Sequence, residues 1–310
     1  MNTKTEKPLV VIILINYNRL EDTLDCLKSL QTVKFDNFKI IVVDNASKLN
    51  PVPHLKKHFP EAIYIRSEKN LGFTGGNNLG LSKAYELDPK YIFLLNNDTI
   101  VSENILSELF DFMEANPDTG LIGPVNYYFE SPNIVAFAGG NLNRNNGMMT
   151  FLYPDTKLPN IKKKVINCSF IIGSAMFIRT DLIKKIGGFY NEYFLTSEES
   201  ELCVKVADLG YKLSIITTCG IWHKISRTME AESELSNYFI FRNKLWFIKR
   251  NAKKITFKDS MGLVKYIIIC LLSFTVKKRN FPAAKGIIEG IYDFFAGVKG
   301  PGRFKNRLNA

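Results

Sequence analysis

The stretch YIFLLNNDTIV, residues 91–101, runs from five apolar residues directly into two amides and a carboxylate. The run Tyr91–Leu95 has the length and composition of a buried β-strand. Polar residues at a strand end are common in solvated turns, so Asn96, Asn97 and Asp98 admit two interpretations. Either they form an exposed turn, or the strand delivers Asp98 to a ligand. The remainder of the chain is needed to decide.

Apolar runs of this kind recur in the first third of the chain and alternate with stretches of helical periodicity. The expected strands are Leu9–Ile15, Lys39–Val43, Ala62–Arg66 and Tyr91–Leu95, and the expected helices are Arg19–Leu30 and Asn77–Leu87. Strands that alternate with helices predict βαβ units. The fold class is therefore α/β, with a mainly parallel sheet flanked by helices on both faces.

Ligands of parallel α/β sheets bind beyond the carboxyl ends of the strands. Polar residues follow three of the expected strands, as Asn16-Tyr17-Asn18, Asp44-Asn45 and Asn96-Asn97-Asp98. Three such strand ends favour a shared ligand site over a chance turn.

The second half of the chain is less regular. We expect loops and short strands over Pro124–Asn167, then a strand over Phe170–Arg179. Asp181 is expected to cap a short helix that ends at Gly187-Gly188. A further helix is expected over residues 198–209, with Leu202, Val206 and Leu209 facing inward.

Composition sets limits on the class of protein. The 310 residues are 46% apolar and 12% aromatic, which is ample for a buried core. The cysteines are an odd number and contain no CxxC pair, which predicts reduced thiols in a cytoplasmic protein, not a disulfide framework or a zinc site. The run Leu9–Ile15 stops at Asn16 without a small-residue cleavage site, so we expect a strand there and not a signal peptide.

The charge is distributed unevenly along the chain. Residues 242–310 hold 16 Lys and Arg against 3 Asp and Glu, a balance of +13, whereas residues 1–241 hold 25 basic and 27 acidic residues, a balance of −2. We therefore expect a near-neutral domain over residues 1–240 and a basic helical appendage over residues 241–310. Such a basic segment is typical of contact with nucleic acid or with an anionic membrane surface.

The apolar runs inside the basic segment favour the membrane. Leu263–Val276 has 14 residues, fewer than the ~20 that cross a bilayer, and with Gly286–Val298 it predicts helices that lie in the interface. The alternative is that these helices pack on the domain or form a homodimer interface. Basic residues interleaved with aliphatic runs do not resemble a platform for stacking nucleobases, so we expect no nucleic acid partner.

Individual motifs narrow the chemistry. Asp44 can accept hydrogen bonds from a nucleobase or ribose, or it can cap a turn. The segment NLGFTGGNNLG, residues 70–80, offers glycines for close backbone approach, but the first strand lacks the GxGxxG of dinucleotide-binding folds.

Asp98 suits a Mg²⁺ or Mn²⁺ ion that takes its other ligands from phosphates and water. Glu198 and Glu199 are adjacent carboxylates, of which one can be structural and the other a general base.

Together and in this order, these segments resemble the family 2 glycosyltransferases, in particular the rhamnosyltransferase-like branch that uses nucleoside-diphosphate sugars. The matching segments, within roughly residues 8–250, are VVIILINYNRLEDTLDCLKSL, IIVVDNAS, NLGFTGGNNLG, YIFLLNNDT, GSAMFIRTDLIKKIGGFYNEYFLTSEESELCVKVADLGYKL, His223 and YFIFRNKLWF. The resemblance implies the Rossmann-like GT-A fold, a nucleotide-sugar donor, a divalent metal and inversion at the anomeric carbon.

The resemblance also assigns roles. NNDT takes the place of the family's DxD motif, with Asp98 as the metal ligand and His223 as a second metal or phosphate contact. Glu199, or alternatively Glu198, would be the base that deprotonates a glycan or lipid-linked acceptor. Donor contacts are expected from Asn16, Tyr17, Asp44, Asn45, Asn70, Gly72, Asn77, Asn96 and Asn97.

Two departures from the family pattern bear on these roles. Asn96 stands where the family often has the first aspartate of DxD, and Glu199 stands where it usually has an aspartate, which lengthens the presumed base by one methylene. A catalytically silent nucleotide-sugar-binding protein is the alternative that this second departure supports. The resemblance points to rhamnose carried on thymidine diphosphate as the donor.

Overall fold

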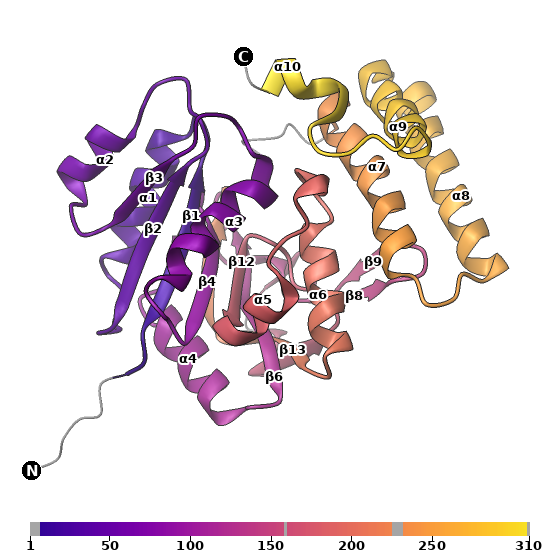
Figure 1. Ribbon diagram of the computed structural model, residues 1–310. Coiled ribbons are helices and arrows are strands. Elements are labelled where there is room, and N and C mark those ends of the chain that lie inside the picture. Colours follow the sequence, from indigo (N-terminus) through magenta and orange to yellow (C-terminus); the bar gives the residue numbers. More distant parts are fainter. Residues whose placement is uncertain (1–6, 158–159, 225–231, 309–310) are drawn as a thin grey trace, which may run out of the picture.

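The computed structural model describes residues 7–157, 160–224 and 232–308 (Figure 1). Its main sheet has the strand order β10-β7-β6-β12-β4-β1-β2-β3. Four strands at one end are mutually parallel: β4 (Tyr91–Asn96), β1 (Val10–Asn16), β2 (Phe38–Asp44) and β3 (Ile63–Arg66). The α/β fold with a mainly parallel sheet is therefore confirmed, with strand bounds within one residue of those expected.

Strand β1 shows why the sheet must be covered on both faces. Successive side chains of a strand point to opposite faces, and the odd and even positions of β1 enter different cores. Val11 and Ile13 belong to one apolar cluster, whereas Val10, Ile12 and Leu14 belong to the other, and all five are fully buried. Helices supply the opposing surfaces: α1 (Leu20–Leu30) and α4 (Ile105–Ala115) cover one face, and α3 (Gly72–Tyr85) covers the other.

The other half of the sheet is mixed. Strand β12 (Ala175–Arg179) runs antiparallel between β4 and β6 (Thr119–Tyr128), and the long β13 (Lys212–His223) is parallel to β6 and antiparallel to β5 (Thr99–Val101) and β11 (Val165–Cys168). The remaining short strands are β7 (Ile134–Phe137), β8 (Gly140–Asn143), β9 (Met148–Phe151) and β10 (Thr156–Lys157). They confirm the loops and short strands expected over Pro124–Asn167.

Most predicted helices are present with shifted ends. Helix α3 begins at Gly72, five residues before the expected start, and α2 (Val52–His58) was not predicted. Helix α5 (Thr180–Ile186) ends as expected at Gly187, whose φ is +84°. Helix α6 (Glu198–Asp208) buries Leu202 and Val206, but the inward placement of Leu209 was wrong. Leu209 is the residue after the helix, where the chain turns towards β13, and it is 37% exposed.

The C-terminal part is helical, as predicted, and lies on the opposite side of the molecule from α2 (Figure 1). It comprises α7 (Glu234–Asn251), α8 (Phe257–Leu272), the π-turn η3 (Ser273–Lys277), α9 (Phe281–Phe295), the short turn η4 (Gly302–Phe304) and α10 (Lys305–Leu308). Residue 241 lies inside α7, so the change in charge does not coincide with a break in secondary structure.

Helix α8 continues without interruption through η3. The continuous helix Phe257–Lys277 has 21 residues, more than the 14-residue apolar run seen in the sequence, because α8 starts six residues earlier. By length and composition alone this helix could cross a membrane, and 6% of its most apolar window is buried.

Candidate active site

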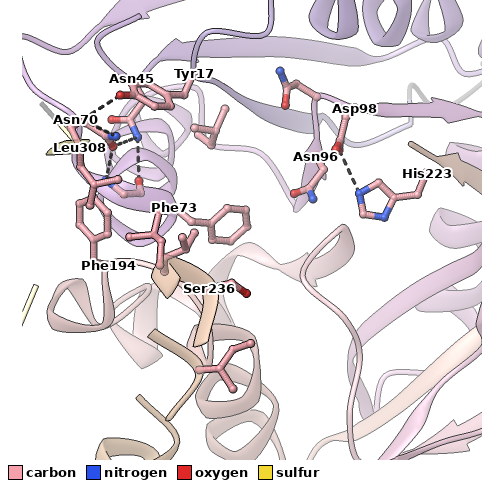
Figure 2. Close-up of a pocket in the computed structure, with 16 residues that line it drawn as sticks. Tyr17, Asn45, Asn70, Phe73, Asn96, Asp98, Phe194, His223, Ser236 and Leu308 are labelled. Atoms are coloured by element: carbon pink, nitrogen blue, oxygen red, sulfur yellow. Dashed lines mark hydrogen bonds and ion pairs between the residues drawn. The ribbon is translucent and has the colours of Figure 1, made fainter. Parts of the chain in front are cut away.

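A cavity of about 490 Å³ opens at the carboxyl ends of β1 and β4, where the sequence predicted a ligand site (Figure 2). Eight of the expected site residues line it: Tyr17, Asn45, Asn70, Gly72, Asn96, Asn97, Asp98 and His223. The other lining residues are mostly apolar and come from β1 (Ile15), α3 (Phe73), the segment just after the η2 turn (Asn191–Tyr193), α7, and Leu308 near the C-terminus. The cavity therefore joins strand ends from the first half of the chain to helices from the second.

The amides on one side of the cavity hold each other in place. The Asn45 side-chain nitrogen donates to Asn70 Oδ1 at 3.1 Å and to the Gly72 carbonyl at 3.0 Å. Asn45 Oδ1 accepts from the Leu71 backbone N–H at 2.9 Å. These bonds fix the turn that leads into α3, with Gly72 at the point of tightest approach.

Gly72 cannot be replaced without strain. Its φ is +71°, and a Cβ built on it would lie 2.2 Å from the Phe194 carbonyl oxygen. Glycine alone combines a positive φ with so close a contact at low energy. The glycine-rich segment thus serves close backbone packing around the cavity.

The C-terminus reaches the same side of the cavity, which the sequence did not predict. The Leu308 carbonyl accepts hydrogen bonds from Tyr17 Oη at 2.9 Å and from the Asn70 side-chain nitrogen at 3.3 Å. Leu308 also lines the cavity, so residues at both ends of the chain form one wall (Figure 2).

Asn16 and Asp44 lie behind the wall and are not among its lining residues. Asp44 is fully buried, and its carboxylate accepts from the Asn16 amide at 2.9 Å and from Ser47 Oγ at 2.5 Å. Arg66 lies 3.2 Å from its second oxygen. In this arrangement Asp44 joins the ends of β1, β2 and β3, and its expected contact with a donor remains a prediction.

Asn97, the residue after β4, links this network to the carboxyl end of that strand. Its side-chain nitrogen donates to Thr23 Oγ1 at 2.8 Å, and Thr23 in turn donates to Asn16 Oδ1 at 2.9 Å. Asn77 is turned to its own helix, where it donates to the Phe73 carbonyl. Asn77 is buried and does not line the cavity.

Asp98 and His223 form a pair on the opposite side of the cavity (Figure 2). His223 Nε2 lies 3.1 Å from Asp98 Oδ1, and both side chains are largely buried. The antiparallel pairing of β5 with β13 sets His223 opposite Thr99, the residue after Asp98. Burial raises the pKa of Asp98, but hydrogen bonding and charge from His223, together with the backbone and the charge of Lys224, outweigh it, so the pKa lies below its ordinary value.

A neighbouring ion-pair cluster fixes this strand end. Lys224 Nζ lies 2.9 Å from both Asp22 and Asp25 on α1, and its backbone N–H donates to the Asp98 carbonyl at 2.9 Å. The side chain of Lys224 is 6% exposed. His223 and Asp98 are therefore held from both strands before any ligand binds.

Glu198 and Glu199 are not lining residues of the cavity, but Glu199 and the lining residue Phe73 both lie close to Gly173. A Cβ placed on Gly173 would be 3.6 Å from Glu199 Cβ and 3.8 Å from Phe73 Cζ, and Phe73 lines the cavity. Glu198 is buried and Glu199 half-buried, and one oxygen of each has no hydrogen-bond partner in the described part of the chain.

Burial raises the pKa of both carboxyl groups, because it disfavours their charged forms. The pKa of Glu198 rises well above its ordinary value, since the adjacent Glu199 carboxylate adds to the effect. The charge of Lys244 works in the opposite direction on the pKa of Glu199. Both carboxyl groups therefore keep their protons to a higher pH than an exposed glutamate would.

Comparison with known proteins assigns the family. The model of glycosyl transferase family 2 matches residues 11–187, more than half of the chain. The chain is a family 2 glycosyltransferase. Its rhamnosyltransferase-like relatives confirm the branch that the motifs suggested.

Three similar proteins illustrate this relationship. The low-salt glycan biosynthesis hexosyltransferase Agl10 of Haloferax volcanii is 24% identical, over 90% of each chain. The dTDP-rhamnosyl transferase RfbF of Shigella flexneri is 19% identical, over 95% of this chain and 98% of its own. The structure of the mannosyltransferase PcManGT of Pyrobaculum calidifontis, with GDP-Man and Mn²⁺, has a TM-score of 0.57 at 12% identity, over 94% of this chain and 88% of that one. The last shows the shared GT-A fold.

The residues of this transferase fit a divalent cation that draws most of its ligands from a substrate. Within residues 7–157, 160–224 and 232–308, no cluster of three or more His, Cys, Asp or Glu side chains could hold a metal alone. Asp98 and His223 supply one carboxylate oxygen and one imidazole nitrogen at the cavity wall. Mg²⁺ and Mn²⁺ sites in phosphate-binding enzymes use one or two protein ligands, with phosphate oxygens and water for the remainder.

Several residues of the glycosyltransferase site had no signal in the sequence. Phe194, Leu195, Leu235, Ser236 and Ile240 line the cavity from the segment just after η2 and from α7. Phe194 and Leu195 belong to the segment GFYNEYFLTSEES and Ile240 to YFIFRNKLWF, which carried the family resemblance only as motifs, whereas Leu235 and Ser236 precede the second motif. The C-terminal part was expected to be helical, and nothing marked the first turn of α7 as a cavity wall.

Proposed function

We propose that this glycosyltransferase transfers a sugar, with rhamnose as the first candidate, from a nucleoside-diphosphate donor to a glycan or lipid-linked hydroxyl with inversion. The observation that carries the proposal is that one cavity has amides on one wall and the Asp98–His223 pair on the other. Rhamnose and thymidine diphosphate are supported by the name of the Shigella flexneri relative.

The donor would lie along the cavity with its nucleoside towards Tyr17, Asn45 and Asn70. These side chains offer an aromatic ring and amide groups, which suit the stacking and hydrogen bonding of a base and a ribose. Its diphosphate would then point to Asp98 and His223. A Mg²⁺ or Mn²⁺ ion held by those two residues would offset the charge that develops on the leaving diphosphate.

Glu199 is proposed as the general base. It would take the proton of the acceptor hydroxyl, whose oxygen then attacks the anomeric carbon as the bond to the diphosphate breaks. The raised pKa of Glu199 makes its carboxylate a stronger proton acceptor than an exposed glutamate. Glu199 and Phe73 both lie beside Gly173, so an acceptor that enters along Gly173 would reach Glu199.

Asn96 would contact the donor without adding a negative charge. Its backbone N–H donates to the Ser174 carbonyl at 2.9 Å, which fixes the strand end beside Gly173. A neutral amide at this position leaves Asp98 as the one carboxylate beside the diphosphate. We place the reaction on the cytoplasmic side, where the five unpaired cysteines would stay reduced.

A donor screen tests the proposal. Thermal unfolding would be measured with Mn²⁺ and a panel that includes dTDP-rhamnose, UDP-sugars and GDP-mannose. A ligand that binds only the native state at 100 times its Kd stabilises it by about 2.7 kcal/mol. We expect one nucleotide class to raise the Tm and its sugar to be transferred with release of the nucleoside diphosphate and an inverted anomeric configuration. Retention of configuration, or a bound donor that no glycan or lipid-linked acceptor consumes, would contradict it.

A further inference from the structure

Helix α8 with η3 carries apolar side chains on two faces. One face packs against the rest of the protein, and the other is exposed. The inner side packs through residues spaced three or four apart, which places them on one helical face. Tyr266, Ile267, Cys270 and Phe274 join the cluster under α7 and α9, and Leu263 contacts the cluster around Phe247. These contacts hold α8 against the rest of the chain.

The outer side carries a second apolar stripe that no described residue covers. It consists of Phe257, Met261, Val264, Ile268 and Leu272, which are 82%, 51%, 48%, 50% and 56% exposed. Their spacing of four, three, four and four residues keeps them on one face for the whole length of α8. Exposed apolar residues scattered over a surface need no explanation, but a contiguous stripe marks an interaction site.

Helix α9 repeats the pattern. Its exposed apolar residues are Phe281, Ile288, Tyr292 and Phe295, again at spacings of one face. The opposite face of α9 is buried against α7, where Gly286 and Gly290 allow backbone contact with Glu234 and Tyr238. Helices α8 and α9 lie together at the end of the molecule away from α2 (Figure 1).

The same segment is strongly basic. Residues 253–285 contain eight Lys or Arg residues and one acidic residue, Asp259, which is engaged in the N-terminal cap of α8. Five of these cations form no ion pair with any described residue: Lys254, Lys258, Lys265, Lys277 and Arg279. Lys258 and Lys265 are exposed on α8 itself, next to the outer stripe.

We propose that the outer stripe of α8, with the exposed face of α9 beside it, docks on the surface of an anionic lipid bilayer. Apolar side chains would enter the headgroup region, while the neighbouring lysines attract acidic lipids. The docking is a property beyond sugar transfer. It would place the enzyme beside a lipid-carried acceptor, and only this last consequence rests on the proposed function.

Charge favours a membrane over a second copy of the chain. Two copies that met through this face would bring together two segments of excess positive charge, which repel each other. The packing of α8 also suits a helix that lies on the membrane surface, and not one that spans the bilayer. To cross a bilayer, α8 would have to abandon the packing of Tyr266, Ile267 and Phe274, and to bury Lys265 near its centre.

Vesicle flotation of the full chain tests the proposal without any donor, so its outcome is independent of transfer activity. We expect binding to vesicles of phosphatidylcholine mixed with phosphatidylglycerol, at least about tenfold weaker binding to pure phosphatidylcholine, and release as salt rises. The double variant Ile268→Gln/Leu272→Gln should bind at least about tenfold more weakly with an unchanged Tm, because both positions are exposed. The matched control is Leu49→Gln, 86% exposed on a distant loop.

The charge contribution has its own pair of variants. Lys258→Glu/Lys265→Glu should weaken binding to anionic vesicles by at least about tenfold, whereas Lys56→Glu/Lys57→Glu on α2 should not. Three results would overturn the proposal: no binding to anionic vesicles at low salt, retention in the membrane after alkaline carbonate extraction, or a stable dimer that Ile268→Gln/Leu272→Gln converts to monomers without any effect on vesicles.

Discussion

His223 Nε2 lies 3.1 Å from Asp98 Oδ1, and these are the only titratable side chains besides Tyr17 among the described residues that line the cavity. The two come from strands far apart in the sequence, and the β5–β13 pairing joins them. Backbone geometry thus prepares a carboxylate and an imidazole on one wall. A cation and a diphosphate are the ligands that such a pair would bind together.

Loss of the Asp98 carboxylate should abolish sugar transfer. Asp98→Ala removes the one acidic group at the cavity wall, so donor binding should no longer respond to Mn²⁺. Asn96→Ala removes an amide from the same wall and should leave partial activity. Calorimetric titration of the donor with and without Mn²⁺ measures the loss of metal-dependent binding, and an assay of sugar transfer measures the activity of both variants. Full activity of Asp98→Ala with Mn²⁺ and donor would rule out the assignment.

Variants of the adjacent Glu198 and Glu199 at the start of α6 should separate an effect on catalysis from an effect on stability. Glu199→Gln should lower kcat by roughly 10²–10⁴-fold with little change in donor affinity, the range expected for a lost general base. Glu198→Gln should keep most activity and raise the Tm at neutral pH, because folding raises the pKa of this carboxyl and its contribution to stability is lost as the pH rises above the ordinary value of 4.5. If Glu198→Gln is inactive and Glu199→Gln active, the two roles are exchanged.

The acid limb of the pH–rate profile should report the same base. A base works only when ionised, and burial raises the pKa of Glu199, so kcat should fall at a higher pH than for an exposed glutamate. The positive charge of Lys244 favours the ionised form of Glu199. Lys244→Met should therefore shift the acid limb to higher pH, whereas Lys56→Met on the distant α2 should leave it in place. An unshifted limb in Lys244→Met would disconnect Glu199 from the profile.

Sequence patterns predicted the parallel half of the fold because each of its strands is a short, mainly apolar run, and a helix pattern follows the first and the third of these runs. Strand β13 escaped prediction, since its run KLSIITTCGIWH mixes polar and apolar residues and its pairing with β6 contains bulges. The polar strand ends were correctly placed at the cavity. Which amide faces the ligand and which faces a neighbour depends on contacts such as Asn16 with Asp44, and no local pattern encodes those. The contact of Leu308 with Tyr17 likewise depends on how α7, α8 and α9 pack, which brings the C-terminal residues back to the first strand.

Alanine substitutions at Gly187 and Gly72 should distinguish the cost of backbone strain from the cost of a steric clash. Gly187 has a φ of +84°, and a Cβ built on it would meet only open space. Gly187→Ala should therefore lower the free energy of unfolding by about 1 kcal/mol, the cost of a non-glycine residue in the left-handed region. Gly72→Ala adds to this strain a contact of 2.2 Å with the Phe194 carbonyl. It should be clearly less stable than Gly187→Ala and should bind donor poorly. Chemical denaturation of both variants measures the difference, and equal stabilities would mean that the segment around Phe194 yields to the added methyl group.

Acid should weaken the fold through Glu201, which binds α6 to α7. Its carboxylate is 3% exposed, lies 2.8 Å from Arg250 and 3.0 Å from Lys205, and accepts from Tyr193 Oη at 2.5 Å. Burial opposes ionisation, but these partners outweigh it and lower the pKa of Glu201 to about 2. A depressed pKa means that the stabilisation is complete above the unfolded value of 4.5 and is lost as the pH falls towards 2.

The difference in unfolding free energy between the native chain and Glu201→Gln isolates this contribution. A depression of this size corresponds to about 3 kcal/mol at neutral pH, which should shrink steadily below pH 4.5 as the native carboxylate takes up its proton. Glu192→Gln is the control, because Glu192 is paired with Lys299 at a more exposed position and should give a small, nearly constant difference. Urea denaturation from pH 7 to pH 3 provides the measurement. A Glu201→Gln difference that stays constant over this range would show that the ion pairs of α6 with α7 do not depend on the charge of Glu201.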